Sequence, residues 1–595
     1  IDMTKKIEFS AGGYGAESGD ALSSVLKIDF KEGNEEELKG KVNLSMVDLG
    51  AIAEGPLNSA STFIIGVRRS YLTDMLKLAG AKGDFNISYY DMQGVFSYKL
   101  TSTNKLNLCL IYSADNFIKD PETRDNHYAY MNYIRSERIR VDKQQTYYGA
   151  ADFNCSSMLA SLSSVNLISP FISNRISVSL YNEKTYNNGI ILRKDLYNFE
   201  NRPDYLYRFN DSVAFLDDRF NKTFVFQCSF DFMPDKNNTV NTGFNYERIS
   251  YDVNTLNSRL EYLISNLSAY PDISKLIYPV DPQYSRHIVL NAPVNKYSFY
   301  AQDSWQIQND LVLNAGLRYD YFDMNKKQTV SPRISLSFIP IPNFSLKAAY
   351  GIFYQTPNYR QLKYDYPSES NTDNQKAVHY IIGADYRVSD ILNLKLEGYI
   401  KKYENMIPVQ LLGDGSLDYG SRENSANGYA RGIDVQLVSD FEWINLRVSY
   451  GYMTAKERLN GTVNYYSRYT DQMHTLASIL DLNLGRKWNA SLRVFYGSGY
   501  AVPSTYLDRS VSPARWITIA AGTKHLPAYE REDIRISKEF EMYSRPLVLY
   551  LDVMNVLNKK NIVTTQYTYD RQGNPNANDV DLFPIIPSIG VMYNF

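Results

Sequence analysis

The sequence predicts an all-β protein, a transmembrane antiparallel β-barrel of about 22 strands with short periplasmic turns and long extracellular loops. Three observations lead to this prediction: long segments that alternate apolar and polar residues, a regular succession of short and long connections, and a high tyrosine content. Tyrosine accounts for 51 of the 595 residues, and its apolar ring with a polar tip suits both strands and a membrane–water interface. Since no run of about 18 apolar residues is present, the sequence predicts no transmembrane helix.

The alternating segments are clearest in the second half of the chain. Residues 309–323, 343–355, 391–401 and 546–553 each place aliphatic and aromatic side chains at every second position. Strands of a transmembrane barrel alternate in this way over about ten residues, whereas a strand of a soluble protein is typically about 5–6 residues long. The length and number of the segments therefore favour a membrane barrel over a soluble sandwich.

The polar positions of these segments are predicted to face the barrel lumen. The candidates are Arg318, Asp320, Lys347, Asn393, Lys395 and Glu397. They could contact a plug or line a substrate path. The alternative is the ordinary mixed-charge interior that every large barrel has.

Short and long connections alternate along the chain. The short turns are 307–310, 339–343, 388–390 and 484–487, and the long polar loops are 355–376, 403–427, 455–472, 498–528 and 558–584. Short turns at one rim and long loops at the other are typical of an outer-membrane barrel. Counting from about residue 38 gives about 22 strands, the size of the plugged outer-membrane transporters, with 120–290 the least regular region.

The chain ends in a strand that is predicted to close the barrel. In IPSIGVMYNF, residues 586–595, Tyr593 and the terminal Phe595 share one apolar face. This pattern resembles the signal by which outer-membrane barrels are recognised for assembly. An ordinary edge strand is the alternative, but such a long exposed apolar edge would aggregate.

A glycine-rich motif, GGYGAESGD, lies close to the start of the sequence. Its glycines and carboxylates are Gly12, Gly13, Gly15, Glu17, Gly19 and Asp20. A dinucleotide-binding loop would need a third glycine where Ser18 stands, and a helix after it. Residues 22–30 are instead predicted to form a strand, so a nucleotide site is not supported.

Several stretches together resemble the TonB-dependent outer-membrane receptors, in the style found in Bacteroidetes. KYSFYAQDSWQIQNDLVLNAGLRYDYFD is similar to the mid-barrel signature of this family, and LPAYEREDIRIS and LDVMNVLNKKN are similar to its C-terminal strands. The stretches are 296–323, 331–357, 526–537, 551–561 and 583–595. They cover most of 290–595, whereas 120–290 matches only loosely.

The same family explains the glycine motif. Residues 7–33 resemble the end of its plug domain, although Ser18 stands where an aromatic residue is usual. The resemblance implies a plug end at 1–36 and a barrel at 37–595, with the first strand near 41–49 and the second within 54–76. The upstream plug and its TonB box are not in this sequence, so we expect residue 1 not to be the native start.

The resemblance implies an outer-membrane transporter that imports a scarce nutrient. Its partners would be outer-membrane lipid, a TonB-type energy-coupling protein if the upstream plug exists, and a surface lipoprotein or other outer-membrane subunit. The alternative is a structural barrel subunit of a larger outer-membrane complex without active transport. A glycan importer of the SusC-like branch fits less well, because those barrels are longer.

Other functions find little support in the sequence. The five histidines have no paired metal-ligand spacing, residues 413–418 lack the full ligand series of a calcium loop, and no G-x-S-x-G elbow exists. Cys109, Cys155 and Cys228 are too far apart for a metal or redox motif. The net charge of −2 does not favour nucleic acid. We therefore expect no enzymatic activity, no metal site and no cofactor.

Overall fold

The computed structural model describes residues 3–78, 85–134, 137–199, 206–266, 286–358, 361, 372–411, 417–418, 423–510, 515–569 and 575–595. Strands make up most of these ranges, and their single α-helix is α1 (Leu72–Leu78). No described helix is long and apolar enough to cross a membrane.

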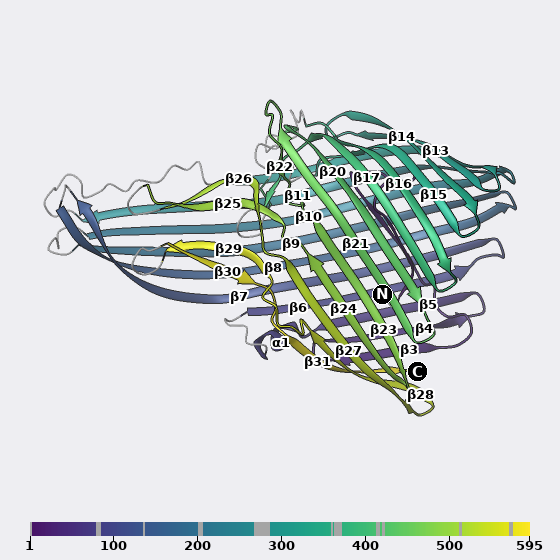
Figure 1. Cartoon of the computed structure of the whole chain (residues 1–595), viewed down its shortest axis with the longest axis horizontal. Helices are drawn as coiled ribbons and strands as arrows, with labels where there is room; N and C mark the ends of the chain where they lie inside the picture. Colours follow the sequence, from purple (N-terminus) through teal and green to yellow (C-terminus); the bar gives the residue numbers. More distant parts are fainter. Residues whose placement is uncertain are drawn as a thin grey trace.

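The strands form one closed antiparallel barrel (Figure 1). Apart from β22 (Tyr466–Ser467), a two-residue strand paired to β21, the described wall contains 22 strands, which confirms the predicted fold class. The wall strands are β3 (Lys39–Ser45), β4 (Asp48–Asn58), β5 (Ser61–Ser70), β6 (Phe85–Lys99), β7 (Asn104–Ile134), β8 (Glu137–Ser169), β9 (Ile172–Phe199), β10 (Leu206–Asp235), β11 (Asn238–Asn266), β12 (Arg286–Gln308), β13 (Leu311–Phe322), β14 (Lys327–Ile341), β15 (Phe344–Gln355), β16 (Gln375–Ser389), β17 (Leu392–Met406), β20 (Ala426–Asp440), β21 (Ile444–Leu459), β23 (His474–Gly485), β24 (Trp488–Gly497), β27 (Tyr529–Met542), β28 (Arg545–Met554) and β31 (Ile586–Asn594).

The first and last wall strands pair with each other and close the barrel. In this seam Val42 of β3 lies opposite Tyr593 of β31. The N–H of Gly40 donates to the carbonyl of Phe595 at 2.8 Å, and the N–H of Phe595 donates back to the carbonyl of Gly40 at 2.9 Å. Closure leaves no unpaired sheet edge in the wall, which removes the usual site of aggregation.

Inward and outward side chains alternate along the wall strands. On β13 the inward Arg318 is 5% exposed, whereas the neighbouring Leu317 points outward and is 53% exposed. The outward faces of β16 and β20 likewise present Ile382 and Ile433. These exposed apolar side chains form the surface that contacts the hydrocarbon of the outer membrane.

The two rims of the barrel differ as the sequence predicts. Each of the four short turns joins two neighbouring wall strands, and each of the five long loops lies between wall strands, although parts of these loops fall outside the described residues. Three long loops carry a two-stranded hairpin. The hairpins are β18 (Gln410–Leu411) with β19 (Leu417–Asp418), β25 (Ala501–Asp508) with β26 (Arg515–His525), and β29 (Ile562–Tyr569) with β30 (Pro575–Asp581).

One sector of the wall rises far above the rest. Strands β7 to β11 have 31, 33, 28, 30 and 29 residues. Crossing a bilayer takes about 9–11 residues, so most of each strand projects outward, on the left of Figure 1. At about 3.3 Å per residue, the 33 residues of β8 span about 110 Å.

The beginning of the wall differs from the prediction. A single first strand at 41–49 is wrong, because β3 ends at Ser45 and β4 starts at Asp48. The Ser45 hydroxyl closes this turn by accepting hydrogen bonds from the N–H groups of Val47 and Asp48, at 3.2 and 3.0 Å. The stretch 54–76 contains the end of β4, all of β5 and part of α1, so it is not one strand.

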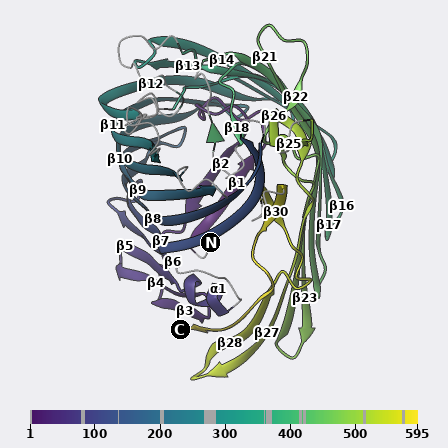
Figure 2. The ribbon, with the colours of Figure 1, turned by 90° about the vertical axis from the view of Figure 1, so that its left-hand side faces the viewer.

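The N-terminal part of the chain lies inside the barrel. We call residues 3–36 the lumen segment. Its two strands, β1 (Thr4–Ser10) and β2 (Val25–Phe30), form a separate antiparallel sheet, which Figure 2 shows within the ring of wall strands. Tyr14 packs in a buried cluster with wall residues such as Phe353 and Tyr403, so one hydrophobic core lies between the segment and the wall.

Candidate functional site

The glycine motif connects β1 to β2 and lies directly against the inner wall. A side chain at Gly12 would place its Cβ 2.7 Å from Cδ1 of Ile381, and one at Gly19 would place it 2.3 Å from Nε of Arg318. Gly13 adopts a φ of +62°, which glycine adopts without strain. The glycines therefore let the backbone itself approach the wall, so that wall side chains can reach its carbonyl groups.

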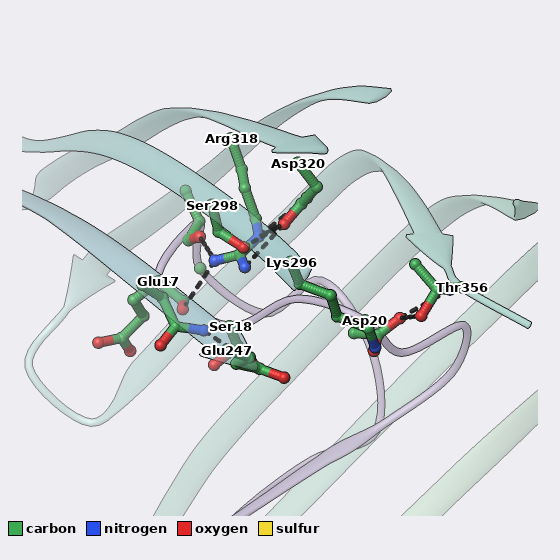
Figure 3. A network of polar contacts seen from close by, with 12 residues as sticks. Glu17, Ser18, Asp20, Glu247, Lys296, Ser298, Arg318, Asp320 and Thr356 are labelled. Carbon is green, nitrogen blue, oxygen red and sulfur yellow. Dashed lines mark hydrogen bonds and ion pairs between the residues drawn. The ribbon is translucent and has the colours of Figure 1, made fainter. Parts of the chain in front are cut away.

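Arg318 of β13 is the first of three cationic anchors. Its Nη1 donates to the carbonyls of Ala16 and Glu17, at 3.3 and 3.1 Å. The carboxylate of Asp320 accepts from Nε of Arg318 at 2.9 and 3.0 Å, and the Ser298 hydroxyl donates to Asp320 at 2.7 Å. Figure 3 shows this arrangement, in which Asp320 and Ser298 orient the guanidinium toward the backbone of the lumen segment.

Arg333 of β14 is the second anchor. Its Nη1 donates to the carbonyls of Tyr14, Gly15 and Ser18, with distances of 3.3 Å to Tyr14 and 2.6 Å to Ser18. Its guanidinium also lies 4.9 Å from the ring centroid of Tyr14 and 4.6 Å from that of Phe353. Arg333 thus holds three carbonyls of one turn and two aromatic faces, which a lysine could not match with its single ammonium.

Lys401 of β17 is the third anchor, and Gln302 of β12 adds a neutral one. Nζ of Lys401 donates to the carbonyl of Ala11 at 2.5 Å and to the hydroxyl of Ser23 at 2.9 Å. The side-chain oxygen of Gln302 accepts from the N–H of Ala16 at 2.7 Å. Both ends of the connection between β1 and β2 are therefore attached to the wall.

His379 of β16 bridges the two sides of the same connection. Its Nδ1 accepts from the N–H of Gly13 at 3.4 Å, and its Nε2 lies 2.9 Å from the carbonyl of Leu22, to which it donates. A ring that accepts at one nitrogen and donates at the other is a neutral imidazole. The ring is fully buried and stacks on Phe353 with a centroid distance of 4.2 Å, so it serves as a packed hydrogen-bonding group.

Asp20 makes the only ion pair described between the glycine motif and the wall. Its carboxylate lies 2.6 Å from Nζ of Lys296, and it accepts from the N–H and hydroxyl of Thr356 at 2.7 and 2.8 Å (Figure 3). Burial by itself would raise the pKa of the Asp20 carboxyl, but Lys296 and Thr356 together hold that pKa below its usual value of 3.8. The side chain of Asp20 is 42% exposed because it borders a cavity.

A polar cavity of about 430 Å³ separates this part of the lumen segment from the tall sector of the wall. Its lining combines carboxylates and cations on both sides. Its charged residues include Glu17, Asp20, Lys27, Arg175, Glu247 and Lys296. A mixed-charge lining of this kind binds water. Away from the cavity the segment also contacts β5 to β7, where the Thr62 hydroxyl donates to the carbonyl of Glu32 at 2.6 Å and Lys99 pairs with Glu35 at 2.7 Å.

The structure brings some of the predicted site residues together in one place. All the glycines of the motif and Asp20 lie against β12 to β17, whereas Glu17 pairs with Lys27 of the lumen segment's own sheet. Arg318 and Asp320 belong to this contact. Lys347, Lys395 and Glu397 share the inward face of β15 and β17, and no hydrogen bond between them and the described lumen segment is present; Lys395 lies 3.8 Å from Asp385.

Sequence analysis missed several contacts of the glycine motif. The missed residues are Lys296, Gln302, Arg333, Thr356, His379 and Lys401. Five of them lie on wall strands at inward positions. The alternation of inward and outward side chains could therefore have identified these five as lumen-facing. The alternation alone could not have shown which inward residues contact the lumen segment.

No group of three or more His, Cys, Asp or Glu side chains in the described ranges is arranged to hold a metal ion. Cys109, Cys155 and Cys228 are free thiols.

Tyr593 and Phe595, the predicted assembly signal, lie at the closing seam with ring centroids 6.3 Å apart.

Comparison with known proteins gives one family and many structural neighbours. Residues 69–556 match the family model described as "TonB dependent receptor-like, beta-barrel". No curated protein sequence matches the chain.

Three solved structures illustrate the likeness. A mutant of the ferric enterobactin receptor PfeA from Pseudomonas aeruginosa has 16% identity, a TM-score of 0.62 and coverage of 100% of this chain and 85% of that one. The ferric-catecholate import receptor Fiu from E. coli K12 has 12% identity, a TM-score of 0.65 and coverage of 97% and 84%. The siderophore receptor PirA from Acinetobacter baumannii has 15% identity, a TM-score of 0.62 and coverage of 99% and 85%. At these identities the likeness concerns the fold.

Proposed function

Because this chain belongs to the TonB dependent receptor-like β-barrel family, we propose that it takes up a ferric siderophore across the outer membrane. The family and the fold support import of a scarce nutrient. The substrate class is inferred from the three neighbours, whose names specify ferric enterobactin, ferric catecholates and siderophores. Uptake of this kind requires binding and gating, with no covalent step.

We propose further that residues 1–36 are the last part of a plug domain and that 37–595 form the barrel. The separate sheet of β1 and β2 and the start of the wall at Lys39 support this division. The plug would reach a TonB-type energy-coupling protein on the periplasmic side.

The attachment of the glycine motif to the wall is the observation that carries this proposal. Arg318, Arg333 and Lys401 hold it through carbonyl groups, and Asp20 adds one ion pair. These contacts are hydrogen bonds and one ion pair, and Arg318 and Asp20 line the polar cavity, so water can replace their contacts first when the segment moves. A plug held in this way blocks the lumen at rest and is released stepwise when a partner pulls on it.

The ligand would be captured at the outer rim. The hairpins β25–β26 and β29–β30 and the tall wall of β7 to β11 extend on that side (Figure 1). Tyrosine in the outer loops supplies rings for apolar contact and hydroxyls for hydrogen bonds, which suits aromatic or peptidic iron chelates.

Uptake of radioactive iron tests the proposal. The protein is produced at its full native length in a Gram-negative host that lacks its own siderophore receptors, and the cells receive catecholate, hydroxamate and mixed ferric siderophores. We expect accumulation from at least one class, abolished by an uncoupler of the proton-motive force. No accumulation from any class, although the folded barrel is present in the membrane, would contradict siderophore import.

The tall wall favours a second candidate, a scaffold subunit of a larger outer-membrane complex. Strands of about 30 residues offer far more surface than ligand capture requires. A scaffold would co-purify with another outer-membrane protein in fixed ratio and show no energy-dependent uptake, which distinguishes the two candidates.

A further inference from the structure

A group of cations faces outward at the extracellular end of three neighbouring wall strands. Lys402 lies on β17, Arg431 on β20, and Lys456 and Arg458 on β21; together we call them the outer cationic patch. Their orientation follows from the alternation. Lys456 and Arg458 flank the buried Glu457, and Lys402 lies between the buried Lys401 and Tyr403.

The pairing of the strands brings these four residues together. Tyr429 of β20 lies opposite Lys402 on one side and Lys456 on the other. Arg431 is two positions further along the same face of β20. Since neighbouring strands are about 4.8 Å apart, the Cα atoms of Lys402 and Lys456 are about 10 Å apart. This spacing allows several of the cations to contact one group of anions.

The patch carries an uncompensated positive charge. Nearby Lys376 pairs with Glu404 at 2.9 Å, so these two outward charges cancel. None of the four patch cations forms an ion pair with a carboxylate of the described chain. Tyrosine rings support them instead: Lys402 lies 5.7 Å from the ring centroid of Tyr380, and Arg458 lies 5.0 Å from that of Tyr465.

The patch lies at the upper edge of the apolar band. Ten residues separate Lys402 from Leu392 at the periplasmic end of β17. At about 3.3 Å per residue and a strand tilt of about 40°, this places Lys402 about 25 Å higher, which is the height of the apolar band. Directly below it, Ile382, Leu396 and Ile400 expose large apolar side chains.

A neighbouring sector of the wall shows that this arrangement is local. At the same rim, β13 and β14 present Tyr319, Tyr321, Gln328 and Val330 on their outward faces. These side chains form an aromatic girdle without cations. This neighbouring sector therefore lacks the combination of four cations, tyrosines and an apolar surface below that β17 to β21 carry.

We propose that the outer cationic patch binds one phosphate-bearing lipid of the outer leaflet. The cations bind the phosphate groups, the tyrosines lie at the level of the headgroup, and the acyl chains lie on the apolar face below. A lipid with two phosphates, such as lipid A, fits the four cations better than a lipid with one. The site lies outside the lumen and does not depend on the proposed uptake.

Native mass spectrometry of the purified barrel, released from phosphatidylcholine nanodiscs containing lipid A, tests this site. The variant combines Lys402→Gln, Arg431→Gln, Lys456→Gln and Arg458→Gln. The control removes four exposed cations near the opposite rim. Its substitutions are Lys236→Gln, Arg387→Gln, Arg486→Gln and Arg545→Gln. Heat-modifiable electrophoretic mobility establishes that each barrel is folded.

We expect wild type and control to retain one bis-phosphorylated lipid A, and the variant to bind it about fivefold more weakly for each cation removed. Dephosphorylated lipid A should bind wild type as weakly as the variant binds lipid A. Equal retention by variant and control, or equal binding of dephosphorylated lipid, would overturn the proposal. Displacement of lipid A by inorganic phosphate would show a simple anion site and overturn the assignment to lipid.

Discussion

Gly19 lies where the lumen segment comes closest to Arg318. The added Cβ of Gly19→Ala would lie 2.3 Å from Nε of a guanidinium that Asp320 and two carbonyls hold in place. Arg318 can therefore move only by losing hydrogen bonds. We expect local opening of the segment to become easier by roughly 1–3 kcal/mol, the usual cost of overpacking, and hydrogen exchange of residues 12–23 to accelerate accordingly.

Gly149→Ala is the matched control for this prediction, because nothing lies within 4 Å of a Cβ at Gly149. That substitution should leave exchange in the lumen segment unchanged. If both variants exchange at the wild-type rate, the contact between Gly19 and Arg318 does not hold the segment.

Asp20 should make the attachment of the lumen segment sensitive to acid. Its pKa in the folded protein is below the usual 3.8, so its contribution to stability is fully present above that value. The contribution disappears as the pH falls through the lowered pKa, because the protonated carboxyl no longer attracts Lys296. Protection factors of residues 12–23, corrected for intrinsic exchange, should therefore fall below about pH 4.

Asp20→Asn should lower this protection at neutral pH and remove its acid dependence. Asp29→Asn, at an exposed position of β2, is the control and should keep the wild-type profile. An unchanged acid transition in Asp20→Asn would assign the pH dependence to another group.

At the residue scale, sequence analysis located the glycine motif and two wall residues of the site, Arg318 and Asp320, and missed the other wall residues. The glycines of the motif were predictable because a cluster of glycines indicates that the backbone lies very close to a neighbouring group. Wall partners such as Arg333 and Lys401 were not, because Arg333 and Ser18, for example, are 315 residues apart. Which inward cation meets which carbonyl depends on strand register and on the depth of the segment, and neither is encoded by local periodicity.

At the scale of the element, the closing seam depends on one glycine. A Cβ at Gly40 would lie 2.1 Å from Cζ of Phe595, so the tip of the terminal ring lies directly against this glycine of β3. We expect Gly40→Ala to reduce the fraction of closed barrel, measured by heat-modifiable mobility. The reason is that the first and last strands can no longer approach each other without displacing that ring.

Gly50→Ala on the adjacent β4 is the matched control, since the nearest atom to its added Cβ is 3.8 Å away. Phe595→Ala gives a second check, because removing the ring should cancel the effect of Gly40→Ala. A loss of closed barrel that persists in the double variant would show that the clash is not its cause.

Alternation predicted strands such as β13, β15, β17 and β28 well, because lipid on one side and water on the other impose period two. The same reasoning failed to foresee the height of β7 to β11. Where a strand rises above the membrane, both of its faces meet water or loops, and the pattern fades. The turn between β3 and β4 was missed because two residues, Met46 and Val47, suffice to reverse the chain.

At the scale of the whole molecule, a barrel of 22 strands is wide enough to leave an aqueous channel unless something fills it. The glycine motif of the lumen segment is anchored to β12 to β17, the stretch around Glu32 contacts β5 to β7, and a polar cavity remains beside the motif. The segment therefore restricts the channel only while its anchors hold. Pore conductance should report directly on those anchors.

Replacing two anchors, Arg333→Met with Lys401→Met, should open this channel. Each substitution removes a charged hydrogen-bond donor worth about 1.5–3 kcal/mol and leaves carbonyls of Tyr14, Ser18 or Ala11 without that partner. In planar bilayers we expect larger and more frequent conductance events than in wild type. Cells should also become sensitive to antibiotics that are normally too large to cross the outer membrane.

The control removes two cations from the same inward face, Lys347→Met with Lys395→Met, which no described hydrogen bond links to the lumen segment. Both pairs change the lumen charge by the same amount, so a purely electrostatic effect on ion flow would appear in both. Only loss of anchoring should separate them. Equal conductance in the two variants would mean that the segment is held elsewhere, and that the contacts of Arg333 and Lys401 are consequences of its position.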